Sequence, residues 1–148
     1  MRILVINGPN LNMLGRRETE HYGADTLESI EQALTEKGKT LGCELAFFQS
    51  NHEGAIIDFI QEKATGADGI LINPGALTHY GYSLHDALVD SGLPVVEVHL
   101  SDIHAREEWR KISVISDVVI KQIAGLKAQS YLLGLEALVN HIRGGEGK

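Results

Sequence analysis

Five short apolar runs, each followed by a segment with helical periodicity, constrain the fold of this chain more than any other feature. The runs are rich in β-branched residues and are bounded by glycine, proline or asparagine, as buried strands usually are. They span residues 2–7, 43–49, 68–73, 94–99 and 118–124. Strands that alternate with helices in this way form a parallel sheet with helices on both faces. The sequence therefore predicts an α/β protein with three layers.

The segments between these runs place apolar residues at helical spacing. They predict helices over residues 25–41, 50–65, 82–91, 105–111 and 126–143. Asp25 or Thr26, with Glu28, and Ser50 with Glu53 suggest capping at the first two helix starts. The glycine-rich tail, residues 144–148, is expected to fray. We predict one flavodoxin-like domain, residues 1–148, with a five-stranded parallel sheet of order 2-1-3-4-5.

The net charge of −7 argues against nucleic acid or an anionic membrane as the main partner, because both require a basic surface. Cys43 is the only cysteine, so neither an intrachain disulfide nor a cysteine-based zinc site can form. The first strand starts at Arg2 and leaves no room for a signal peptide, and no apolar run approaches the ~20 residues of a membrane span. A cytoplasmic protein is expected.

Ligands of doubly wound sheets bind outside the carboxyl ends of the strands, where the strand order reverses. Here the first strand leads into NGPN (7–10), the third into NPG (73–75) and the fourth into EVHLS (97–101). The amides of Asn10 and Asn73 can donate to an oxygen that gains negative charge. Each asparagine taken alone is also ordinary turn chemistry. Their convergence predicts a site at this edge.

Glu97 and His99 lie two residues apart on the fourth predicted strand, so their side chains share one face. A carboxylate beside an imidazole fixes the ring tautomer and favours the charged ring, as in an oriented acid–base pair. The pair is equally consistent with two side chains that only satisfy each other in the structure. The asparagines at the neighbouring strand ends favour catalysis.

A long loop, residues 10–23, follows the first strand and carries Arg16, Arg17, His21 and Tyr22. Loops of this length in compact domains are often lids. Lowering the pKa of a phenol from ~10 to ~7 takes about 4 kcal/mol, and a neighbouring guanidinium such as that of Arg17 lowers a pKa by about 1 to 3 units. Tyr22 is therefore either a base or, as exposed loop tyrosines usually are, a packing residue.

Backbone N–H groups after His99, together with Arg106 and Arg110, can hold a carboxylate. A metal hydrolase is an alternative, in which His99, Asp102 and His104 would bind the ion, although their spacing is not diagnostic. A third alternative is a non-catalytic module that binds phosphate or flavin. The first strand is not followed by a glycine-rich or Ser/Thr-rich phosphate loop, which counts against that module.

Several motifs in register along nearly the whole chain are more specific than any one alone. They are INGPNL (6–11), LGRRE (14–18), YG (22–23), NPG with TH (73–79), EVHLS (97–101) and HAREE (104–108). In these motifs the chain resembles the type II 3-dehydroquinate dehydratases. The resemblance implies conversion of 3-dehydroquinate to 3-dehydroshikimate in the shikimate pathway, or the reverse in quinate catabolism. It also implies no metal, Schiff base or other cofactor, and a homododecamer of four trimers.

The resemblance further implies a role for each matching residue. Tyr22 would act as phenolate base on the C2 proton, with Arg17 stabilising the phenolate, and Asn10 would steady the enolate through a water molecule. His99, held by Glu97, would protonate the departing C1 hydroxyl. The implied substrate-binding groups are the main-chain N–H groups of Leu100 and Ser101, the side chains of Asn73, His79 and Arg110, Arg106 on the lid side, and Asp86 from a neighbouring subunit.

The chain departs from the family's usual pattern at four positions. Tyr80 and Gly81 stand where small hydroxyl residues are common, His85 stands for arginine and Asp102 for asparagine. None of the four replaces an implied acid or base. The departures bear on subunit contacts and on the oligomer.

Overall fold

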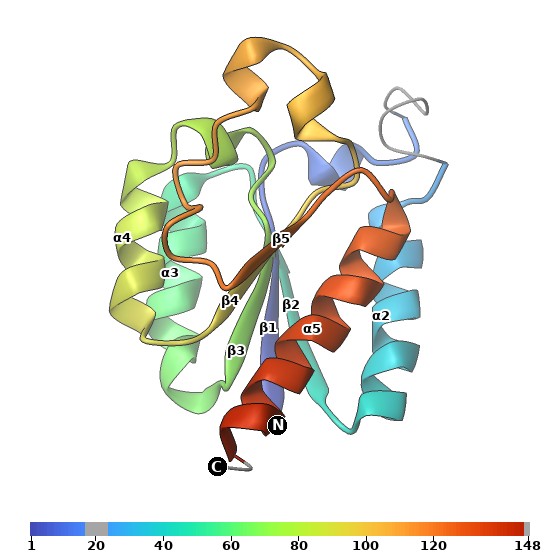
Figure 1. Ribbon diagram of the computed structural model, residues 1–148, viewed down its shortest axis with the longest axis vertical. Helices are drawn as coiled ribbons and strands as arrows, with labels where there is room; N and C mark the ends of the chain where they lie inside the picture. The colour runs from blue at the N-terminus through green and yellow to red at the C-terminus, as the bar shows by residue number, and fades with distance from the viewer. Residues whose placement is uncertain (17–23, 147–148) are drawn as a thin grey trace.

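A single five-stranded sheet organises the protein. The computed structural model (Figure 1) describes residues 1–16 and 24–146. The strands are β1 (Arg2–Asn7), β2 (Glu44–Gln49), β3 (Gly69–Asn73), β4 (Val95–Val98) and β5 (Lys121–Ile123), and the helices are α2 (Leu27–Leu41), α3 (Glu53–Lys63), α4 (Tyr82–Ser91) and α5 (Ala128–Glu146). Short 3-10 turns η1 (Leu11–Met13), η2 (Ala64–Gly66), η3 (Gly75–His79), η4 (Ile103–Ala105) and η5 (Glu108–Arg110) complete the order.

All neighbouring strands pair in parallel, in the order β2-β1-β3-β4-β5. Helices α2 and α5 cover one face of the sheet, and α3 and α4 cover the other (Figure 1). The predicted flavodoxin-like fold and its strand order are confirmed. Because β1 and β3 are central neighbours, their carboxyl ends meet beside that of β4.

Two hydrophobic cores lie on the two faces of the sheet. Successive residues of β1 alternate between them: Ile3 and Val5 face α2 and α5, whereas Leu4 and Ile6 face α3 and α4. All four are fully buried. A strand covered on both faces carries apolar residues at every position, which is why β1 reads as a continuous apolar run.

The caps at the starts of α2 and α3 only partly match those that the sequence predicts. Thr26 caps α2, but its capping-box partner is Ser29 rather than Glu28. The predicted capping box of Ser50 and Glu53 at the start of α3 is not formed, so that prediction was wrong. His52 occupies the N-cap position there without a side-chain bond, and the Glu53 carboxylate instead accepts from the backbone N–H of Leu84 at 3.0 Å. The Glu53 carboxylate that the local capping box required is thus used in a long-range contact with α4.

The segment after β4 differs most from prediction. The expected helix over residues 105–111 is instead the two turns η4 and η5, in a stretch that arches over the carboxyl end of the sheet (Figure 1). Seven residues make an isolated helix only marginally stable. The backbone N–H of Val114 donates to the carbonyl of Thr78 and ties the arch to η3. At the other terminus α5 continues through Glu146, so the tail expected to fray from Gly144 is helical over 144–146.

Candidate active site

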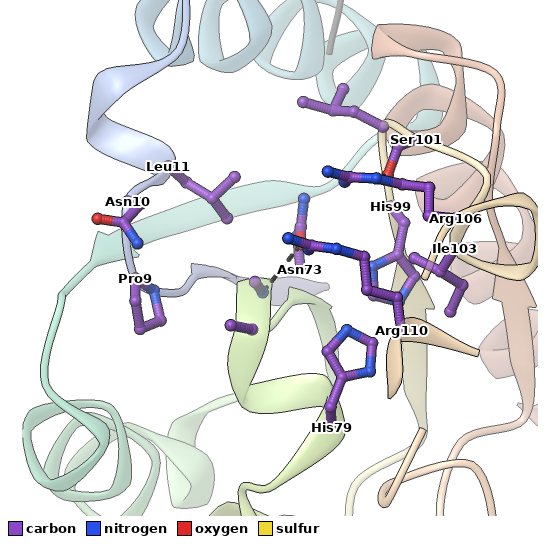
Figure 2. A pocket seen from close by; sticks show the side chains of 13 residues that line it. Pro9, Asn10, Leu11, Asn73, His79, His99, Ser101, Ile103, Arg106 and Arg110 are labelled. Carbon is purple, nitrogen blue, oxygen red and sulfur yellow. Dashed lines mark hydrogen bonds between the residues drawn. The ribbon is translucent and has the colours of Figure 1, made fainter. Parts of the chain in front are cut away.

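A cavity of about 120 Å³ opens at the carboxyl ends of β1, β3 and β4. Arg106 and Arg110 extend into it from the arch after β4, and Asn10 lies on the opposite side (Figure 2). The sequence-predicted residues that line it are Asn10, Asn73, His79, His99, Leu100, Ser101, Arg106 and Arg110. Topology thus brings together polar groups from three separate stretches of sequence.

The central feature of this site is the pair formed by His99 and Glu97. His99 is 5% exposed and Glu97 is completely buried, and the His99 Nε2 atom forms a short hydrogen bond to the Glu97 Oε2 atom. Glu97 also accepts from the Ser113 hydroxyl and from the Gln122 side-chain amide, each at 2.9 Å. A buried carboxylate with three donors has its lone pairs well satisfied.

The environment keeps Glu97 ionised. Burial alone would raise the pKa of its carboxyl, but the hydrogen bond and positive charge of His99, with the hydrogen bonds from Gln122 and Ser113, hold the pKa below its usual 4.5. An ionised carboxylate can only accept, so His99 Nε2 carries the proton. The other ring nitrogen, Nδ1, is left for a ligand in the cavity.

His79 lies at the edge of the cavity and is neutral. Its Nδ1 atom is 2.7 Å from the carbonyl oxygen of Ile112, which can only accept, so Nδ1 carries the proton and Nε2 is left as an acceptor. Burial lowers the pKa of His79, and the charges of His99 and Arg110 lower it further, against the opposing effect of the bond to Ile112 and the charge of Glu97. The ring meets Trp109 edge-on, with centroids 5.1 Å apart, and the Arg110 guanidinium stacks on the same indole at 4.1 Å.

Trp109 therefore orders two polar side chains of the site. Arg110 is also held at 2.7 Å by the carboxylate of Glu107. A guanidinium stacked on an aromatic ring and anchored at one nitrogen still presents its remaining N–H groups to a ligand.

The backbone after β4 forms a cradle for an anion. The Leu100 carbonyl accepts from Lys127 N at 2.9 Å and the Ser101 carbonyl accepts from Gly125 N at 3.0 Å. The first bond fixes the peptide that carries the Ser101 N–H, and the second fixes the peptide after it. The N–H groups of Leu100 and Ser101 donate to no acceptor within residues 1–16 and 24–146. Successive free N–H groups of this kind attract carboxylates and phosphates. The Arg106 guanidinium donates to the Ser101 hydroxyl at 3.3 Å and adds positive charge beside them.

Asn73 lines the cavity, and hydrogen bonds to its side chain fix its orientation. Its Nδ2 atom donates to the Tyr131 hydroxyl at 2.9 Å, and its Oδ1 atom accepts from Gly75 N at 3.1 Å. The Tyr131 hydroxyl in turn donates to Asn7 Oδ1 at 2.6 Å. Asn73 is thereby fixed before any ligand arrives.

Asn10 has a left-handed backbone, with φ of 69°, a conformation that asparagine tolerates better than most residues. Its backbone N–H donates to the Asn51 side chain at 3.0 Å. Gly8, two residues before Asn10, packs against Pro74, the residue after β3, so closely that an added Cβ would lie 2.2 Å from the Pro74 carbonyl oxygen. The turn that presents Asn10 to the cavity therefore requires glycine at position 8.

Asp86 is the predicted site residue that the described part of the chain places away from this cavity. Arg17 and Tyr22 lie outside the described residues. Asp86 lies on α4 with its side chain 81% exposed, where it bonds to His85 rather than lining the cavity. The His85 ring also donates to the Asp117 carboxylate, and its hydrogen bonds to Asp117 and Asp86 raise the pKa of His85.

The metal ligands suggested by the sequence do not converge. His99 Nε2 bonds to Glu97, His104 Nε2 lies 3.1 Å from the side-chain Oε1 atom of Gln122, and the Asp102 side chain accepts from the backbone N–H of His104. Within the part of the chain that the structure describes, no three His, Cys, Asp or Glu side chains are placed to hold a metal ion. Nor does any helix in that part combine the length and apolar character of a membrane span.

Sequence reasoning missed Ser113, Gln122 and Tyr131. Gln122 had a visible signal, because it is a polar residue inside an apolar predicted strand and pairs in register with Glu97. Tyr131 also had a signal, because its polar hydroxyl stands among the apolar residues of the last predicted helix. Ser113 stands in an irregular segment, where nothing in the sequence distinguishes it.

Known proteins resemble this chain over nearly its full length. The family model described as dehydroquinase class II matches residues 1–139. The 3-dehydroquinate dehydratase of Halothermothrix orenii is 54% identical, covering 97% of either chain, and that of Roseiflexus castenholzii is 56% identical over 94% of this chain and 88% of its own. The crystal structure of a type II dehydroquinase from Butyrivibrio crossotus superposes with a TM-score of 0.90 at 48% identity, covering 93% of this chain and 97% of the other.

Proposed function

The chain belongs to the class II dehydroquinase family, and on that premise we propose how its own residues carry out the reaction. The enzyme is a hydro-lyase that dehydrates 3-dehydroquinate to 3-dehydroshikimate. The reaction removes a proton from C2 and the hydroxyl from C1, through an enolate whose charge lies on the C3 oxygen. It needs a base, a stabiliser of the enolate and an acid.

His99 is the acid. The observation that carries this assignment is the buried hydrogen bond between His99 and the ionised Glu97, at the bottom of a cavity lined by polar groups. Glu97 compensates the positive charge of the ring when both nitrogens are protonated. The ring can then give its Nδ1 proton to the departing C1 hydroxyl, which leaves as water.

Tyr22 is the base, and Arg17 stabilises its phenolate. Both assignments rest on the family resemblance, since the two residues lie outside the described part of the chain. Asn10, which lines the cavity opposite the arch, stabilises the enolate through a water molecule. Base and acid thus act from two different segments of the chain.

The remaining polar groups hold the substrate. The free N–H groups of Leu100 and Ser101 bind its carboxylate, with Arg106 nearby on the lid side. Neutral His79 accepts from a substrate hydroxyl through Nε2, and the prepositioned groups of Asn73 and Arg110 complete the hydroxyl contacts. Because these groups are fixed by other bonds, binding orders few side chains.

Asp86 contributes to the cavity of a neighbouring subunit. Its carboxylate is exposed and does not line the cavity of its own chain, which leaves it accessible to another copy. The proposed assembly is a dodecamer of four trimers in the cytoplasm. Sedimentation of the purified protein measures the assembly, and a monomer with full turnover would contradict this role of Asp86.

The test is an absorbance assay for the conjugated enone product, with chelator present. Tyr22→Phe and His99→Ala should each lower kcat by at least about 100-fold while leaving the circular dichroism spectrum unchanged. Wild-type turnover in either variant would refute the assigned roles. Loss of wild-type activity in chelator would instead favour a metal enzyme.

A further inference from the structure

A chain of hydrogen bonds leads from the buried His99–Glu97 pair to a surface residue. Gln122 lies on β5 directly opposite Glu97, and its Nε2 atom is 2.9 Å from Glu97 Oε2. On the other side, the Gln122 Oε1 atom is 3.1 Å from Nε2 of the exposed His104. The proposed function uses neither Gln122 nor His104.

The direction of every bond in this chain follows from Glu97. An ionised carboxylate only accepts, so the NH₂ group of Gln122 must face it and the amide oxygen must face His104. His104 Nε2 must then carry a proton. The neutral Nε2–H tautomer and the charged ring both meet this requirement, so the bond does not depend on the charge of His104.

The same chain connects the pair to the arch that lines the cavity. His104 belongs to η4, where its backbone N–H donates to Asp102 Oδ1 at 3.0 Å. Ser101, Ile103 and Arg106, on either side of His104, line the cavity. The Gln122 amide therefore holds Glu97 through its nitrogen and this part of the arch through its oxygen.

We propose that Gln122 and His104 are positioning residues for the dehydration. Gln122 orients the Glu97 carboxylate toward His99, and His104 holds the Gln122 amide in its donating orientation and fixes the arch to the pair. This inference rests on the proposed role of His99. The simpler possibility is that both residues only anchor the short edge strand β5.

The first test is Gln122→Met, which keeps the length of the side chain and removes both hydrogen bonds. Loss of a bond to a charged group is expected to lower kcat about 10- to 100-fold, with KM changed less than about 3-fold. Glu97 also loses a donor that lowers its pKa, so the acid limb of the kcat–pH profile should move to higher pH. Among the described residues, His99 and His79 interact with this carboxylate and His104 lies beyond Gln122, and all three are kept.

The second test uses two variants of the exposed residue His104, which can be changed without disturbing the core. His104→Met removes the donor, and His104→Gln keeps an N–H group at similar reach. We expect kcat to fall about 3- to 10-fold in His104→Met and to recover most of that loss in His104→Gln. This pair carries the test even if Gln122→Met does not fold.

The His99→Ala background separates positioning of the acid from simple anchoring of β5. In that background Gln122→Met should have no further effect on residual turnover, because the pair that it positions is gone. Gln122→Met with wild-type kcat and an unmoved pH profile, or equal kcat for the two His104 variants, would overturn the inference. If His99→Ala itself kept wild-type turnover, the proposed function would fail instead.

Discussion

Two buried polar networks lie at the same end of the sheet on opposite faces, and they differ in charge. Under α2 and α5, the Tyr131 hydroxyl links the side chains of Asn7 and Asn73. On the face of α3 and α4, Glu97 gathers His99, Gln122 and Ser113. The first network contains only neutral groups and the second contains an ionised carboxylate.

The difference follows from what surrounds each network. Tyr131 is completely buried, and burial raises its pKa above the usual 10, so its proton is retained and can bridge two amides. Glu97 is equally buried, but its donors lower its pKa. A neutral network gives rigidity at little electrostatic cost, whereas a charged one is costly unless every lone pair is satisfied. We infer that the neutral network maintains the site and the charged one performs its chemistry.

The largest expected effect separates the two networks by turnover. Glu97→Gln replaces an acceptor with an amide that presents N–H groups to donors and removes the charge that compensates the His99 ring. We expect kcat to fall about 10²- to 10⁴-fold in steady-state assays. Ser113→Ala, which removes one donor and leaves the charge, is the matched control, and its kcat should fall much less. Similar kcat values for the two variants would contradict a special role for the charge.

The next effect separates the networks by stability. Tyr131→Phe leaves Asn7 Oδ1 and Asn73 Nδ2 without this buried partner, so the free energy of unfolding in urea should fall by about 1 to 3 kcal/mol. Turnover of the folded protein should change less than about 10-fold, since the acid and its carboxylate are untouched. A loss of kcat as large as that of Glu97→Gln would show that the neutral network also takes part in chemistry.

A smaller effect is expected at the cavity edge. His79→Ala removes one neutral acceptor for the substrate, which predicts an increase in KM of about 3- to 10-fold with kcat nearly unchanged. Trp109→Phe keeps an aromatic ring beside His79 and Arg110 and serves as the control. A fall in kcat without a change in KM would assign His79 to catalysis instead of binding.

The smallest effect concerns the pH dependence of stability. Because the Glu97 pKa lies below 4.5, its ionised form contributes stability that is present above that pH and lost as pH falls through the lowered pKa. The stability difference between wild type and Glu97→Gln should therefore shrink in urea titrations as the pH falls below about 4.5. The difference between wild type and Tyr131→Phe should stay constant there, because Tyr131 keeps its proton.

The strands and their order were predictable because buried parallel strands are marked by local composition. The β1 and α4 boundaries match the predicted ones, since each ends at a strong signal, Gly8 and Gly92. The helix predicted after β4 and the cap at Ser50 failed for different reasons. Seven residues are too few for a stable isolated helix, and at the start of α3 the Glu53 carboxylate bonds to the distant Leu84 N–H instead of completing the local motif.

The candidate site was predictable wherever a residue stands at the end of a strand. Asn10, Asn73 and His99 converge because topology alone places those ends together. Their supporting residues were not predictable in this way. The Tyr131 hydroxyl meets Asn7 across 124 positions of sequence, and only packing of α5 on the sheet brings them together.

The amino-acid sequence by itself determined the alternation of strands and helices, the sheet order and the edge at which the polar side chains collect, because periodicity and turn residues act over a few positions. Only the tertiary structure decided which side chains hold Glu97 and Asn73 in place. Those bonds depend on distances between segments remote in sequence, which no local pattern encodes.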